Sequence, residues 1–226
     1  MTQTQVALSP RKLSTPRAAA VAGIVFSLLY GSSLVLIHLS IPTDPAADTT
    51  WLDTNAKSVA LALNLVPYAG IAFLWFIGVI RDRFGELEDR LFASVFLGSG
   101  LLFLALTFIG AAMAGGLLSS YTALSSAVID SGLYTYGRSV VYQIINIYAI
   151  RMAGVFMISL GTIWIRTGLM HRGWAFLTYG LALVLLLSIS VSIWVTLLFP
   201  AWVLAVSVYI LILNLHKHSQ ELISEI

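Results

Sequence analysis

The chain has 226 residues, of which 59% are hydrophobic and only 10% are charged. Soluble domains carry about 25% charged residues, so this composition predicts a membrane protein. The formal net charge of +2 provides no concentrated basic surface for nucleic acid. The absence of cysteine excludes disulfides, thiolate metal sites and a cysteine nucleophile.

Apolar runs divide the chain into six segments, each suited to a membrane-spanning helix of about 20 residues. They cover residues 18–41, 58–80, 91–117, 141–165, 174–194 and 197–215. We therefore predict an all-α, polytopic membrane bundle with six transmembrane helices. Residues 18–216 would form the transmembrane domain, and residues 1–17 and 217–226 would be polar cytoplasmic tails.

The last two spans have the least certain boundary in the sequence. The apolar stretch from Trp174 to His216 is too long for one crossing. We expect a turn near 193–199, because Pro200 ends or kinks a helix that precedes it. A single kinked helix over 174–216 is the alternative, and it would leave five spans.

Lysine and arginine residues predict the orientation, because they are enriched in cytoplasmic segments. Two basic residues, Lys57 and Arg138, fall in the predicted outer segments, and Arg151 lies within a span. Both termini are therefore predicted to be cytoplasmic, and we expect the protein in the plasma membrane of a prokaryote. The nine basic residues on the predicted inner side are Arg11, Lys12, Arg17, Arg81, Arg83, Arg90, Arg166, Arg172 and Lys217.

Small residues at helical spacing predict close packing between membrane helices. Gly23, Ser27 and Gly31 recur every four residues on the first span. Ser99 lies between glycines, and we interpret it as part of a packing surface, since no span places a buried base beside it. A flat surface on the third span could bind a second copy or a membrane partner; its residues are Gly110, Ala111, Ala114 and Gly115.

The predicted spans contain no pattern of residues typical of a catalytic or metal-binding site. All ten acidic residues lie in loops or tails, which argues against ion coupling through a buried carboxylate. The four histidines lie at the ends of spans, so no pair within the membrane is available for haem. We expect no catalytic residue, no metal site and no cofactor.

Arg151 is the exception within the run 147-IYAIRMAGVF-156, because it places a permanent cation inside a span. Arg166, 15 residues later in the chain, marks the predicted inner boundary of this span. A helix rises about 22 Å over this length, so Arg151 should lie about 8 Å below the outer surface. Its guanidinium could simply extend toward water. Alternatively, it could organise a polar pocket in the outer half of the bundle.

The candidate pocket residues lie at similar depth on three spans. Tyr148 shares the helix face of Arg151, while Asn64 and Tyr68 belong to the second span and Ser33 to the first. With no carboxylate nearby, a buried Arg151 would need carbonyl groups, Asn64, tyrosine rings or hydroxyls as partners. Alternatively, it would bind an anionic lipid or a small anion, which a guanidinium can hold with two hydrogen bonds.

Three classes of function remain open from the sequence. The first is a non-enzymatic ligand- or lipid-binding protein, a channel or a carrier, with transport as its broad role and a polar pocket around Arg151. The second is a structural or accessory subunit of a membrane complex. The third is an intramembrane enzyme, which the missing carboxylates, cysteines and paired histidines disfavour.

Overall fold

The structure is a computed structural model that describes residues 15–41, 50–84, 90–130, 132–168, 170–187 and 193–224. These residues are almost entirely helical and contain no strand, which confirms the prediction of an all-α bundle. The elements are α1 (Thr15–Ser40), α2 (Thr50–Phe84), α3 (Arg90–Asp130), α4 (Leu133–Gln143), a π-helical segment (Ile144–Ala149), α5 (Ile150–Thr167), α6 (Arg172–Leu187), a 3-10 turn (Ile193–Leu197) and α7 (Leu198–Ser224).

Membrane-spanning length is reached by five helical stretches within the described ranges, namely Arg17–Ser40, Thr54–Arg81, Leu91–Ala123, Leu133–Thr167 and Trp194–Leu213. The apolar helix α6 is shorter, with 16 residues, and rises about 24 Å. It runs alongside α5, so the bundle comprises five long helices and one short one. α6 and α7 are separate helices, so the alternative of one kinked helix over 174–216 is wrong.

Pro200 explains where α7 can begin. It occupies the first turn of α7, where a missing N–H breaks no intrahelical hydrogen bond. The sequence signal at Pro200 therefore marks the start of a helix after the fold-back.

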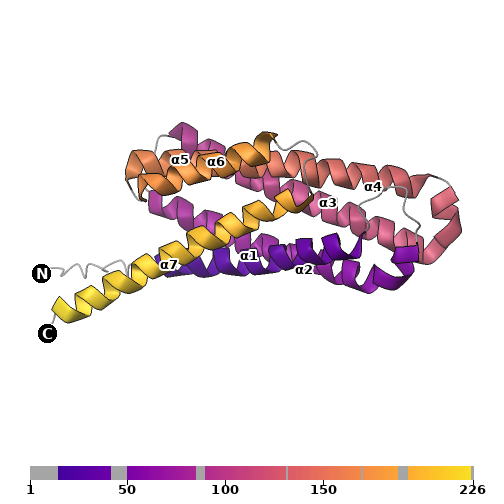
Figure 1. Ribbon diagram of the computed structural model, residues 1–226, viewed down its shortest axis with the longest axis horizontal. Helices are drawn as coiled ribbons and strands as arrows, with labels where there is room; N and C mark the ends of the chain where they lie inside the picture. The colour runs from indigo at the N-terminus through magenta and orange to yellow at the C-terminus, as the bar shows by residue number, and fades with distance from the viewer. Residues whose placement is uncertain are drawn as a thin grey trace, which may run out of the picture.

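The helices pack around the bundle largely in chain order. α1 lies along α2, α2 along α3, α3 along α5, and α5 along α6, while α7 returns to pack against α1. α6 and α7 approach each other over only a short length, so theirs is the sparsest contact between neighbouring helices of the bundle. α1 begins and α7 ends at the same end of the elongated molecule (Figure 1), as expected for cytoplasmic termini on one side.

The predicted outer segment 118–139 is helical over most of its length. α3 has 41 residues and is about 60 Å long, roughly twice the thickness of a bilayer core. Gly132, with a φ of 72°, adopts the left-handed conformation before the chain turns back into α4. Figure 1 shows α3 and α4 running side by side at the end opposite the termini. The helix continues through 118–129 because no proline or charge interrupts this stretch.

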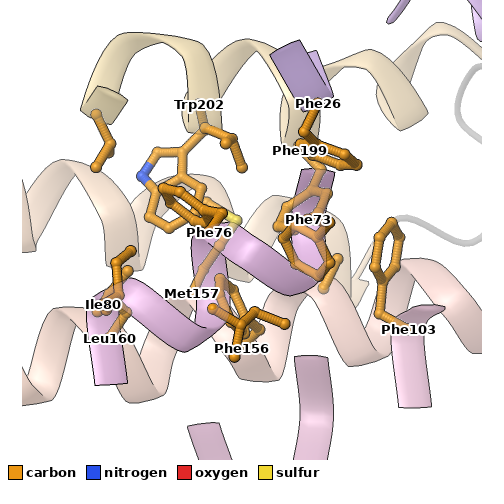
Figure 2. Packing of buried hydrophobic residues seen from close by; sticks show 14 of the residues in the cluster. Phe26, Phe73, Phe76, Ile80, Phe103, Phe156, Met157, Leu160, Phe199 and Trp202 are labelled. Carbon is orange, nitrogen blue, oxygen red and sulfur yellow. The ribbon is translucent and has the colours of Figure 1, made fainter. Parts of the chain in front are cut away.

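The core of the bundle is a cluster of aromatic rings contributed by α1, α2, α3, α5 and α7 (Figure 2). Ring centroids lie 4.6 Å apart for Phe26 and Phe73, and 4.7 Å apart for Phe103 and Phe199. Phe156 stacks on Phe96 at 4.6 Å. Such pairs contribute about 0.5–1.5 kcal/mol each beyond area burial. At the level of this cluster, the centre of the described bundle is filled with apolar side chains.

Candidate functional site

Arg151 lies near the beginning of α5, directly after the π-helical segment Ile144–Ala149. α4, this segment and α5 form one continuous helical stretch from Leu133 to Thr167. Short π-helical insertions are rare and occur frequently at functional sites. The Arg151 side chain is half-buried, so it is neither sealed in the core nor fully exposed.

The neighbouring helix α6 runs antiparallel to α5. Thr162 Oγ1 lies 2.8 Å from the Tyr179 hydroxyl of α6. Nearer the outer end, a Cβ atom added to Gly154 would lie 3.0 Å from Cγ of Leu186. Continuing this antiparallel register by one turn places Arg151 at the level of Leu187 of α6.

An arginine at the centre of a membrane helix costs about 2.5–3.5 kcal/mol, and less near the surface. Arg151 is predicted to lie near the outer surface, where water or an anion can solvate its guanidinium.

Internal partners distinguish Arg151 from two other arginines of the same helical stretch. The guanidinium of Arg166 lies 4.5 Å from the centre of the Phe92 ring, and Arg138 also interacts within the chain. In the described part of the chain, Arg151 has no hydrogen bond, ion pair or ring contact of this kind. Its guanidinium is also not among the enclosed polar atoms. It is accessible from outside the protein.

The other predicted pocket residues occupy different environments. Ser33 is completely buried and donates a hydrogen bond of 2.7 Å to the carbonyl oxygen of Ala62, so it joins α1 to α2. Asn64 and Tyr68 are exposed on the opposite face of α2. Tyr148 is 58% exposed, one turn before Arg151 on the same helix. Tyr148 and Arg151 are thus neighbours along one helical stretch, whereas Ser33 serves helix packing. A pocket shared by all five residues stays a prediction.

The π-helical segment is the part of this site that the sequence did not indicate. Its residues IINIYA read as ordinary apolar helix. Asn146 was visible as a polar residue, and its amide Nδ2 donates to the carbonyl oxygen of Tyr142 at 3.3 Å. No residue type specifies a π-helical insertion, so no sequence signal could have located it.

Polar residues buried among the helices are mostly used in packing. Ser99 donates to the carbonyl oxygen of Val95 at 2.6 Å, and Gly100 beside it contacts Ile77 and Phe156. This supports the interpretation of Ser99 as a packing residue. Likewise, Tyr30 is hydrogen-bonded to the side chain of Thr107.

The predicted small-residue surface of α3 is partly covered by the chain itself. Gly110 is buried, and a Cβ atom added there would lie 2.5 Å from Cγ1 of Ile145. Ala111, Ala114 and Gly115 are half-buried. These residues therefore serve packing within the chain at least in part. Over the described ranges, no group of three or more His, Cys, Asp or Glu residues is positioned to hold a metal ion.

No protein family model matches this chain, and no curated protein or solved structure is significantly similar to it. The apolar helices themselves define the class: the chain is a multi-pass integral membrane protein whose helices lie in a lipid bilayer.

Proposed function

We propose that this protein is a non-enzymatic membrane protein that binds a phosphate-type anion at Arg151, in the outer half of a plasma membrane. The observation that carries the proposal is the guanidinium of Arg151, which is half-buried and accessible within a span. This guanidinium has no partner in the described part of the chain. A planar guanidinium holds a phosphate group through two parallel hydrogen bonds. Tyr148, exposed one turn away, adds a hydroxyl donor at the same level.

A lipid headgroup is the source of phosphate that fits this position best. Arg151 lies about 8 Å below the outer surface of the hydrocarbon layer, within reach of headgroups by extension of its side chain. The aromatic cluster fills the bundle centre, which favours binding at the periphery over conduction through the middle. A channel or carrier role is therefore less well supported than lipid binding.

The first test measures thermal stability of the purified protein in detergent. Added phosphatidylglycerol should raise the melting temperature of the native protein more than phosphatidylcholine does. Arg151→Leu should lose this difference, and Arg151→Lys should lose most of it, because an ammonium group cannot form the two-pronged contact. Arg166→Gln, at the inner end of the same helix, is the matched control and should retain the difference.

Two further arms separate the possible anions. Inorganic phosphate in place of lipid should have little effect if the ligand is a headgroup, whereas full stabilisation by phosphate would assign a soluble anion. Mass spectrometry of the native protein and of Arg151→Leu compares co-purifying phospholipids. An identical lipid dependence in Arg151→Leu and the native protein would refute an anion site at this residue.

A further inference from the structure

An exposed stripe on α2 faces away from the rest of the chain. Four of its large side chains are more than half exposed, namely Leu61 at 55%, Tyr68 at 64%, Ile71 at 54% and Trp75 at 66%. The opposite face of the helix packs into the core through residues such as Ala62, Val66, Ala69, Phe73 and Phe76. Among the described residues, the stripe is therefore left largely uncovered by the rest of the chain.

The stripe carries polar groups within the membrane-spanning length of α2. Asn64 is exposed, and its carboxamide has no hydrogen bond within the described residues. Pro67, exposed on the next turn, has no N–H to donate to the carbonyl of Leu63. Asn64 lies about 25 Å from Arg81, which is still inside a hydrocarbon layer of about 30 Å. Lipid chains cannot satisfy these groups.

The exposed face of α6 shows what a purely lipid-facing surface looks like in this protein. Beyond Arg172 at its first position, the exposed large side chains of α6 are apolar: Phe176, Leu177, Leu183, Val184 and Leu187. The stripe on α2 differs because it combines apolar side chains with an amide and a phenol hydroxyl. This composition suits contact with another protein helix better than contact with lipid.

We propose that the stripe on α2 binds the same stripe of a second copy of this chain. A carboxamide is both donor and acceptor, so two Asn64 side chains can satisfy each other across a two-fold axis along the membrane normal. The exposed positions Leu61, Asn64, Tyr68, Ile71 and Trp75 are spaced alternately by three and four residues. This is the spacing at which two helices pack along a continuous seam.

The self-complementary amide selects a second copy as the partner. A different protein would need its own polar group at the same depth, whereas a two-fold axis brings an identical Asn64 to that depth automatically. The stripe does not include Arg151, so dimer formation and anion binding are independent properties.

Cysteine cross-linking in native membranes tests the contact, and the chain contains no cysteine that would interfere. Ile71→Cys and Leu61→Cys should form a disulfide-linked species of twice the monomer mass on mild oxidation. Leu183→Cys, which is 54% exposed on α6, is the matched control and should form much less. Equal cross-linking at Ile71 and Leu183 would overturn the proposal, and so would a cross-linked product of any other mass.

The amide is tested separately in the Ile71→Cys background after reconstitution into vesicles of defined lipid. Asn64→Leu should weaken dimer formation by roughly 3- to 20-fold, the range measured for hydrogen bonds between membrane helices. Asn64→Gln should retain most of it. Arg151→Leu should cross-link like the native sequence, which keeps the failure of either proposal distinguishable. Unchanged cross-linking in Asn64→Leu would remove Asn64 from the contact.

Discussion

Two glycines of α1 that look alike in sequence have different structural roles. A Cβ atom added to Gly23 would overlap the Ser207 hydroxyl of α7 and lie 2.8 Å from Cδ2 of Phe76. The same atom added to Gly31 would meet nothing within 4 Å. The predicted small-residue face of α1 is therefore a close contact at Gly23 and open at Gly31. Gly23 fixes how closely α1, α2 and α7 approach one another.

Alanine substitution at these two glycines should separate the roles. Gly23→Ala should destabilise the protein by about 1–3 kcal/mol, because the added methyl group overpacks the junction of three helices. Gly31→Ala should be neutral or slightly stabilising, since alanine favours helix. The measurement is the melting temperature in detergent. Adding Ser207→Gly to Gly23→Ala should recover part of the loss; equal losses in the two single variants would contradict the assignment.

At the scale of elements, the sparsest contact between neighbouring helices of the bundle is the one between α6 and α7. The buried indole of Trp202 donates to Oγ1 of Thr178 at 2.9 Å across this sparse contact. On the other side of α6, the Tyr179 hydroxyl bonds to Thr162 of α5. Consecutive residues of α6 thus hold it to both of its neighbours.

Removing the Thr178 hydroxyl should weaken the contact between α6 and α7. Thr178→Val keeps the shape but leaves the Trp202 N–H buried without an acceptor, which costs about 1–3 kcal/mol. Thr162→Val is the matched control and should cost less. Tyr179 is only half-buried, and Thr162 lies about 6 Å from the predicted inner boundary at Arg166, so the Tyr179 hydroxyl can extend toward interfacial water. Thermal unfolding of both variants in detergent checks this. A loss at Thr162 as large as that at Thr178 would refute the special role of the indole contact.

At the scale of the whole molecule, the long helices extend beyond the length needed to cross a bilayer at the end opposite the termini. About 20 residues counted from Arg90 are enough to cross the hydrocarbon layer, and the remainder of α3 continues beside α4. Thr122 and Thr135 are exposed side chains on this helical hairpin. The basic residues near the opposite end predict that this end faces the cytoplasm.

Labelling of single cysteines in intact cells should report this arrangement. Thr122→Cys and Thr135→Cys should react with a membrane-impermeant maleimide added from outside, because both lie on the outward hairpin. His171→Cys, exposed between α5 and α6, should react only after the cells are opened. The reverse labelling pattern would invert the topology and place Arg151 in the inner half of the membrane.

Hydropathy alone predicted the class of fold and most of the helices of this protein. Long apolar runs must form helices in lipid, because every backbone polar group has to be satisfied internally. Proline at 200 and the length of the stretch 174–216 predicted the fold-back between α6 and α7. Arg151 was also visible as a charge within a span, because a charged residue contrasts with any apolar run.

Only the tertiary structure decided which faces of these helices meet. In a membrane the core and the surroundings are both apolar, so a helix has no polar face that marks its exposed side. For this reason the sequence did not distinguish Gly23 from Gly31, or buried Ser33 from exposed Asn64. The extension of α3 to Asp130 and the π-helical segment before Arg151 likewise depend on packing between helices, which hydrophobic pattern does not encode.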